Sequence, residues 1–391
     1  MNAEVSPKRI SQLLSIKMHT KVLLLIVVCS TIFACKPNDD ASSPSKQADR
    51  RPLVENLGDN CILPSYQSLN LAMNTFALEA DVFIANPSLT NLTTLRTKFL
   101  DLYTKWEYVA PFNFGPAAAS NVMLDTRTVN VFPTDTIAIG TKIKQGVATI
   151  PQTSSTTYSG FPAIDFLLYG NILTDEQVVD SFAMSINRCN YLKALCTHIK
   201  SKVNTASSNW TTGGSNFNNL YRNNTGLDLG SSTSQTINMM VYDIENCKNF
   251  KLGIPLNISQ NTVIDPNVVN PSKCEAYYSE SSMVLLLASI ESIRTLYMGI
   301  STTGVDGYGF DDYLIAIDRA ALDTQIKYQL NLVQTKLNAI GEPISDAVQD
   351  PIGKQKVVEA YNETQNLLTL LKVDFASAVG ILISYGDTDG D

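Results

Sequence analysis

Apolar residues recur at steps of three and four through most of the chain, and this spacing limits its fold more than any other feature. The pattern occupies segments 92–109, 182–203, 283–300, 322–340 and 358–375. Such steps place side chains on one face of an α-helix, whereas the strict alternation that is typical of half-buried strands is scarce. The sequence therefore predicts an all-α protein.

A segment rich in Asn, Ser, Thr and Gly interrupts the periodicity between Thr205 and Gln235. Turn residues without periodicity indicate a connection between structured parts. Each side of it holds about four long helices, the number that closes a bundle around one core. We predict a signal region at 1–34, a lipidated cysteine and tether at 35–54, a first bundle at 55–210, a linker at 211–235 and a second bundle at 236–391.

The N-terminus has the pattern of a bacterial export signal. Met18-His19-Thr20-Lys21 leads into an apolar run that is too short to cross a bilayer as a permanent helix. A small residue precedes Cys35, as in a lipobox, so we expect Cys35 to be lipidated and to become the mature N-terminus. The signal itself begins at Met18 if translation starts there. The alternative is a plain secretory signal that is cleaved nearby.

The residues after Cys35 indicate where such a lipoprotein would reside. Residues 36–51 are polar and contain Pro, Ser and Asp, which is typical of a flexible tether. Lys36 follows the cysteine in place of Asp, and the sorting pattern of bacterial lipoproteins then favours the outer membrane. We expect a lipid-anchored protein in the envelope of a Gram-negative-type bacterium, facing either the periplasm or the outside.

Charge and cysteine content exclude some partners and sites. The formal net charge of −8 argues against binding to the phosphate backbone, so no nucleic-acid partner is expected. Loss of Cys29 and lipidation of Cys35 leave an odd number of cysteines, so at least one stays unpaired. Cys189 and Cys196 are two helical turns apart on one face, which favours buried thiols.

The mature chain has a single histidine, because His19 leaves with the signal. His198 falls off the apolar stripe of its own helix, which favours a solvated surface position over a role as ligand or base. A zinc site with several histidines is excluded.

Two short motifs are only weak evidence for a binding site. The glycine-rich stretch 304–310 lies between two predicted helices and indicates an interhelical turn, since no strand precedes it. The end of the chain, 387–391, is similar to the start of a calcium loop but lacks the residue that closes one, so it indicates an acidic tail or a weak calcium contact.

One carboxylate stands within an almost wholly apolar run, Gly160 to Gly170 (GFPAIDFLLYG). Pro162 suits the first turn of a helix, where its missing N–H would have no partner. Asp165 then lies one turn later on the same face, near a helix N-terminus that favours negative charge. It has either a functional role or a structural one, in which it accepts hydrogen bonds or pairs with a basic residue across the bundle.

Several segments together resemble the imelysin family over nearly the whole mature region. They are Tyr103–Glu107 with Phe112–Pro116, Arg127 and Phe132–Pro133, then GFPAIDFLLYG, Ser232–Pro255, Tyr277–Ser282 and Leu371–Asp387. The resemblance implies two packed four-helix bundles with a cleft between them and a location in the cell envelope. It also implies either a metallopeptidase or a link to iron acquisition.

The family carries G-x-H-x-x-E where this chain has Gly160, Pro162 and Asp165. Proline has no side-chain donor or acceptor, so the first ligand of the implied metal pair is missing, and aspartate reaches less far than glutamate. We therefore expect a protein that is not an enzyme. The candidates for binding a ligand in the cleft are Gly160, Pro162, Asp165, Trp106, Arg127, Ser279 and Ser282.

The sequence thus predicts a non-catalytic, lipid-anchored protein that binds a small ligand, a metal or an envelope protein between its helical halves. An oxygen-only site that includes Asp165 would hold iron or calcium as a cofactor. One alternative is a metallopeptidase with an altered metal site that uses Asp165 with carboxylates from the second half. Another is a structural surface lipoprotein that docks a partner.

Overall fold

Helices make up most of the chain that the computed structural model describes, which is residues 47–151, 157–259, 262–265 and 267–384. A short antiparallel hairpin of β1 (Ile258–Ser259) and β2 (Thr262–Val263) accompanies them. The prediction of an all-α protein is confirmed. The predicted signal, Cys35 and the acidic tail lie outside the described residues. Within those residues, no helix is both long enough and apolar enough to cross a membrane.

The first half of the described chain contains three long helices and several short ones. Its elements are α2 (Arg51–Asn56), η1 (Leu57–Ile62), α3 (Leu63–Ala85), α4 (Leu89–Glu107), η2 (Ala110–Phe112), α5 (Thr126–Val129), α6 (Thr136–Lys144), α7 (Phe161–Tyr169), α8 (Asp175–Ala183), α9 (Ile186–Trp210) and α10 (Phe217–Asn223).

The second half contains four long helices, the hairpin and shorter turns. Its elements are α11 (Ser232–Asn246), η3 (Cys247–Gly253), η4 (Pro271–Lys273), α12 (Ser282–Tyr297), α13 (Phe310–Ala316), α14 (Ala320–Ile340), α15 (Ile344–Ala347), α16 (Pro351–Thr369), η5 (Leu370–Phe375) and α17 (Ala376–Val379). The glycine-rich stretch 304–310 connects α12 to α13, as expected of an interhelical turn.

Polar side chains and glycines set the ends of these helices. The Ser88 side chain accepts a hydrogen bond from the Asn91 N–H at the start of α4, and Ser185 does the same for Arg188 at the start of α9. Such caps satisfy backbone donors that have no partner inside the helix. Gly341 ends α14 in the left-handed conformation, with φ of 74°, which glycine adopts without steric cost.

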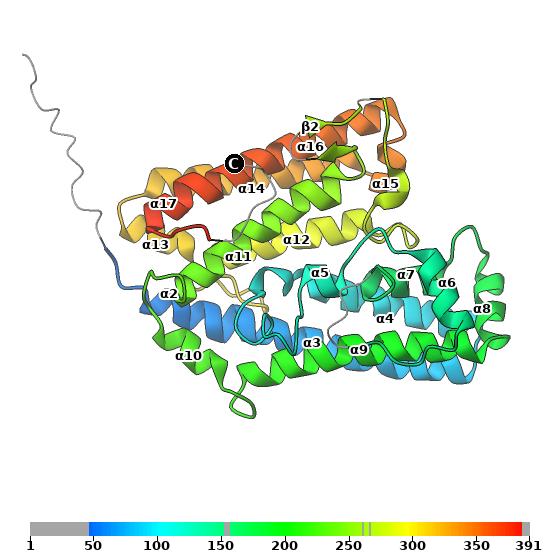
Figure 1. The fold of residues 1–391 in the computed structure, drawn as a ribbon. Coiled ribbons are helices and arrows are strands. Elements are labelled where there is room, and N and C mark those ends of the chain that lie inside the picture. The colour runs from blue at the N-terminus through cyan, green and yellow to red at the C-terminus, as the bar shows by residue number, and fades with distance from the viewer. Residues whose placement is uncertain (1–46, 152–156, 260–261, 266, 385–391) are drawn as a thin grey trace, which may run out of the picture. The chain divides into compact units, whose positions relative to one another are not determined.

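The helices from Ala48 onward belong to one compact unit and pack as two layers. In the first half, α3 packs against both α4 and α9. In the second half, α12 and α16 each pack against both α14 and α11. Figure 1 shows the two layers, with α4 of the first facing α12 of the second. The predicted count of four long helices in each half is not confirmed for the first half.

Three segments of wider π-helix interrupt the long helices. They are η1 between α2 and α3, η3 at the end of α11, and η5 between α16 and α17. A π-turn inserts an extra residue and so rotates the following side chains, which is why such turns are frequent at functional sites. The segment η3 carries Lys251, which lies in the contact zone of the two layers.

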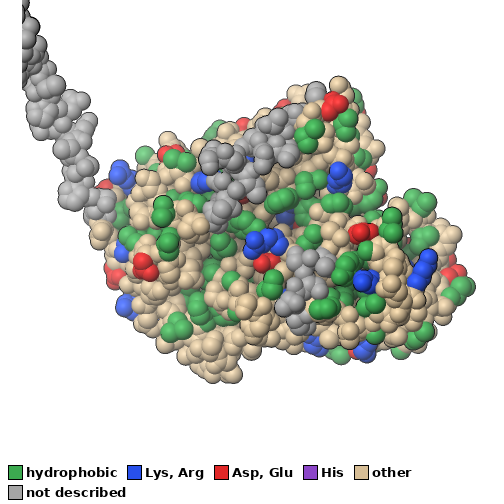
Figure 2. All heavy atoms as spheres, viewed as in Figure 1, with side chains coloured by type: hydrophobic (Ala, Val, Ile, Leu, Met, Phe, Trp, Pro, Cys, Tyr) green, Lys and Arg blue, Asp and Glu red, His purple; other side chains and the backbone are tan. Residues whose placement is uncertain are grey.

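His198 contradicts its predicted surface position, because its side chain is 1% exposed. The sequence pattern shows a single apolar stripe on α9, but α6 and the segment that contains Val122 also lie against this helix. Lys202, one turn after His198, donates to the Val122 carbonyl at 2.7 Å. Burial first, and the Lys202 charge second, lower the pKa of His198 to about 4. No histidine is visible among the described side chains in Figure 2.

The cysteine prediction is confirmed for Cys189 and Cys196, whose thiols are buried. All five described cysteines are free and buried. The largest buried side chains include Trp106 and Trp210, which belong to a single apolar core that runs through the described helices.

Candidate functional site

Asp165 lies in the first turns of α7, in the contact zone of the two layers. Gly160 precedes the helix with φ of 83°, and Pro162 occupies its first turn, as the sequence predicts. The Asp165 side chain is 1% exposed and accepts a hydrogen bond from the Tyr278 N–H at 3.0 Å. Burial raises the pKa of Asp165 to about 7, although the Ser279 side chain and nearby backbone N–H groups oppose the change.

A buried charge network lies in the same contact zone and joins the layers. Lys251 of η3 places Nζ 2.6 Å from Oε2 of Glu107, the last residue of α4, and 2.9 Å from Oε2 of Glu275. Ser289 of α12 accepts from Lys251 at 2.9 Å and donates to Glu107 at 2.7 Å. Since buried charges are tolerated only when paired, these contacts hold the halves in one arrangement.

The network continues into the first half through polar side chains. Asn130 donates from Nδ2 to Oε1 of Glu275 at 2.6 Å, and the Tyr103 hydroxyl donates to Asn130. Asp243 of α11 is also buried near this cluster, and burial raises its pKa to about 7. Lys251 thus pairs with two buried carboxyl groups, and its charge also acts on the third, Asp243.

Burial and neighbouring charges shift the pKa values of Glu107 and Lys251. Burial, followed by the negative charge of Glu275, raises the pKa of Glu107 above its ordinary range, against the opposing effect of Lys251. For Lys251 itself, burial disfavours the ammonium, but the Glu107 and Glu275 carboxylates outweigh burial and raise its pKa. The buried network therefore keeps Lys251 protonated beside carboxyl groups that compete for its charge.

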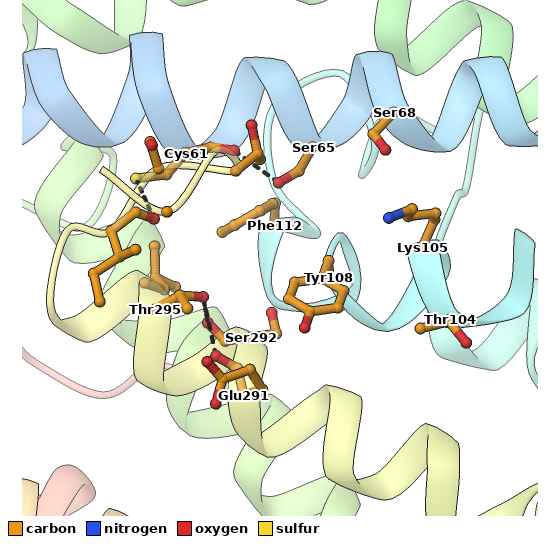
Figure 3. Close-up of a pocket in the computed structure, with 15 residues that line it drawn as sticks. Cys61, Ser65, Ser68, Thr104, Lys105, Tyr108, Phe112, Glu291, Ser292 and Thr295 are labelled. Carbon is orange, nitrogen blue, oxygen red and sulfur yellow. Dashed lines mark hydrogen bonds between the residues drawn. The ribbon is translucent and has the colours of Figure 1, made fainter. Parts of the chain in front are cut away.

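A cavity of about 450 Å³ opens beside this network, between α3 and α4 of the first layer and α12 of the second. Figure 3 shows its walls, with the loop at 300–304 closing one end. Its volume is in the range of small-molecule pockets. The lining residues are Cys61, Ser65, Ser68, Thr104, Lys105, Tyr108, Phe112, Glu291, Ser292, Thr295, Leu296, Ile300, Ser301, Thr302 and Gly304.

Hydroxyl groups dominate the polar part of this lining. Some bond the backbone, as when Ser65 donates to the Cys61 carbonyl at 2.7 Å. The charged residues of the lining are Lys105, in the last turn of α4, and Glu291 of α12. Tyr108 and Phe112 add aromatic surface. A site of this composition can bind a small polar ligand through hydroxyl groups and one or two charges.

The structure brings five of the predicted site residues together around α7. Gly160, Pro162 and Asp165 lie at its start, and Ser279 adjoins Asp165. Trp106 packs on Phe161 of this helix with ring centroids 5.8 Å apart, but its side chain is 1% exposed and belongs to the core. The small hollow over Pro162 and Asp165, about 10 Å³, has room for about one water molecule.

The other two predicted site residues lie elsewhere. Arg127 has a side chain that is 75% exposed and an ion pair of 3.6 Å with Asp125. Ser282 begins α12, and its Oγ accepts a hydrogen bond from the Ile344 N–H at 3.2 Å. None of the seven predicted residues lines the 450 Å³ cavity. The sequence pattern does not single out its Lys105 and Ser292, although Lys105 lies within one of the segments that resemble the imelysin family.

The residues around Asp165 do not fit a bound metal ion. Pro162 offers no donor, and the described part of the chain contains no group of three or more His, Cys, Asp or Glu residues placed to hold a metal. At the charge network, the Lys251 ammonium already supplies the cation between Glu107 and Glu275. The donor chemistry therefore gives no basis for a metal-dependent step.

Comparisons with known proteins identify relatives of this chain. The model of the imelysin family (Peptidase_M75) matches residues 62–371. A solved structure described as a candidate iron-regulated protein A precursor, from Parabacteroides distasonis ATCC 8503, is similar with a TM-score of 0.69 and 20% identity, covering 86% of this chain and 97% of that one. An imelysin-like protein from Psychrobacter arcticum 273-4 has a TM-score of 0.63 and 16% identity, covering 85% and 97%. No curated protein matches the chain.

Proposed function

Because the chain belongs to the imelysin family, we propose that it is a non-catalytic, lipid-anchored envelope protein that binds a small polar ligand in the cavity between α3, α4 and α12. The cavity is the observation that carries the proposal. It lies where the two helical halves meet, as expected for a cleft-binding protein, but it lies away from the altered family motif at Gly160 to Asp165.

The composition of the cavity supports binding rather than hydrolysis. Hydroxyl groups, one lysine and aromatic surface can orient a polar molecule, and its volume of about 450 Å³ suits a small one. Hydrolysis at a metal requires three protein ligands and an open position. The motif segment offers Asp165 alone, and this carboxylate is buried against the Tyr278 backbone.

The anchor is part of the proposal. The apolar run, the small residue before Cys35 and Lys36 after it support lipidation and sorting to the outer membrane. Labelling of the full chain with radioactive palmitate checks this step. We expect label in the wild type and none in Cys35→Ala, whereas label in both forms would contradict lipidation at Cys35.

A role in iron acquisition is an extension of the proposal, supported by the description of the Parabacteroides distasonis protein as iron-regulated. The family name favours a metallopeptidase as the second candidate function. Peptide cleavage by the purified protein that stops when a chelator is added would favour this alternative over simple binding.

A binding experiment tests the main proposal. The soluble chain from Lys36 onward is incubated with small molecules extracted from the bacterium that encodes it, and bound compounds are identified by native mass spectrometry. Ser68→Trp fills the cavity from the half-buried α3 wall, and Gln67→Trp is the control on its exposed neighbour. We expect a compound that binds the wild type and Gln67→Trp but not Ser68→Trp. Binding by none, or equally by all three, contradicts the proposal.

A further inference from the structure

The cavity contains one positive charge that the described chain leaves without a counter-ion. Lys105 is half-buried in the lining and makes no hydrogen bond or ion pair to any described residue. Figure 3 shows its amine directed into the space beside Tyr108 and Phe112. A buried or half-buried cation without a partner favours a negatively charged group from outside.

The acidic residue of the lining does not serve as that partner. Arg294, on the same helix, places Nε 2.9 Å and a second guanidinium nitrogen 2.8 Å from Oε2 of Glu291. This two-point contact neutralises Glu291 within the second layer. Of the two charged residues among the described cavity walls, Lys105 therefore supplies the net charge of the site.

The uncharged polar groups of the cavity wall indicate which other groups the ligand carries. The hydroxyls of Ser68, Thr104 and Ser292 have no hydrogen-bond partner among the described residues, and each can donate and accept. Hydroxyl groups of a ligand match such a wall, because they also do both. The Tyr108 and Phe112 rings can pack against C–H groups of the ligand.

Resting on the proposed function, we infer that the cavity selects a small organic anion that carries hydroxyl groups, with its charged group on Lys105. The anion is either a carboxylate, as in a sugar acid, or a phosphate, as in a sugar phosphate. A lysine ammonium binds both as a point charge, so the lining alone does not favour one source.

Titration calorimetry with four probes tests this inference on the chain from Lys36 onward, which contains the compact unit that begins at Ala48. The probes are D-glucuronate, D-glucose 6-phosphate, neutral D-glucose and cationic D-glucosamine. We expect at least one anion to bind about ten-fold more tightly than glucose, since a hydrogen bond to a charged group contributes that much. The stronger of the two anions identifies the source.

Two lysine variants assign the selectivity. Lys105→Gln removes the charge and keeps polar atoms, and we expect it to lose the preference for the anion while glucose affinity stays unchanged. Lys98→Gln, two turns earlier on α4 and outside the cavity lining, is the control and should behave as wild type. If Lys105→Gln keeps the preference for the anion, the inference is wrong. It is also wrong if the wild type binds glucose or glucosamine as tightly as it binds both anions, or if the wild type binds none of the four probes.

The outcomes separate this inference from the proposed function. If an extracted compound binds in a way that Ser68→Trp blocks, but the anionic probes show no advantage, the cavity binds a ligand of another charge and the inference alone fails. If no extracted compound binds the wild type, the proposed function itself fails.

Discussion

Lys251 of η3 and Glu107 of α4 form a buried ion pair, 2.6 Å between Nζ and Oε2, that joins the two helical layers of this imelysin-family protein. The residues are 144 positions apart in the chain. Their side chains are 5% and 1% exposed, so neither charge has water as an alternative partner. Stability should therefore depend on keeping both members.

We expect Lys251→Met to lower the free energy of unfolding by about 3–5 kcal/mol, because it leaves buried carboxylates without their cation. Urea unfolding of the chain from Lys36 onward at pH 7 measures the loss. Lys193→Met is the control: its 2.8 Å pair with Asp81 has side chains that are 61% and 54% exposed, and water screens such pairs. A loss of the same size in both variants would contradict the account of the network.

The buried carboxyl of Asp165 should make stability depend on pH. Its pKa is about 7 in the folded protein against an ordinary value of 3.8. Between these values the folded protein holds a proton that the unfolded chain releases, so stability falls as pH rises from about 4 to 7 and changes no further above that.

Asp165→Asn removes this titration and keeps an oxygen that can accept from the Tyr278 N–H. Urea unfolding at pH 5, 6, 7 and 8, a range that runs from about two units below the shifted pKa to about one unit above it, compares the two proteins. We expect the variant to gain stability relative to wild type between pH 5 and 7. A difference that stays constant over this range would show that the carboxyl titrates as it does in water.

Gly160 should be required for its backbone conformation. Its φ of 83° with ψ of −168° lies in a region that is essentially restricted to glycine, and an added Cβ would meet the Val129 carbonyl oxygen at 2.3 Å. We expect Gly160→Ala to cost at least about 1–3 kcal/mol. Thermal unfolding measures the change.

Gly140 provides the matched control within α6. A Cβ added there has no heavy atom within 4 Å, and alanine in a helix interior is favoured over glycine by about 0.5–1 kcal/mol. Gly140→Ala should therefore raise the melting temperature slightly. If both substitutions had the same sign, the role assigned to Gly160 would be wrong.

The five free cysteines should react slowly in the folded protein. Burial raises the pKa of the Cys61, Cys196 and Cys274 thiols to about 12, so little reactive thiolate is present at neutral pH. With an aromatic disulfide reagent, we expect almost no reaction under native conditions. In guanidinium chloride, five thiols should titrate in the chain from Lys36 onward, which lacks Cys29 and Cys35. Rapid native reaction, or fewer thiols after unfolding, would contradict the buried, unpaired state.

Local signals in the sequence predict much of the fold. The steps of three and four that define α4, α9, α12, α14 and α16 depend on neighbours within one helix, and Pro162 marks the first turn of α7 for the same local reason. The surface position predicted for His198 fails because a segment far along the chain covers its helix.

The site depends on contacts that local patterns do not contain. In the sequence, Glu107, Lys251 and Glu275 look like ordinary surface charges. Only the fold, in which η3 packs against α12, brings Lys251 to both carboxylates. The cavity likewise combines residues of α3, α4 and α12 with a loop at 300–304. The family motif predicts a site at Asp165, but the fold leaves only a hollow for about one water molecule there.

A crystal structure of the protein loaded with its extracted ligand tests the central claim most directly. We predict ligand density between α4 and α12, within hydrogen-bond distance of Lys105 and the Ser292 hydroxyl. Density beside Asp165 and Tyr278, with the α3–α4–α12 cavity holding solvent alone, would contradict the account and return the binding site to the altered family motif.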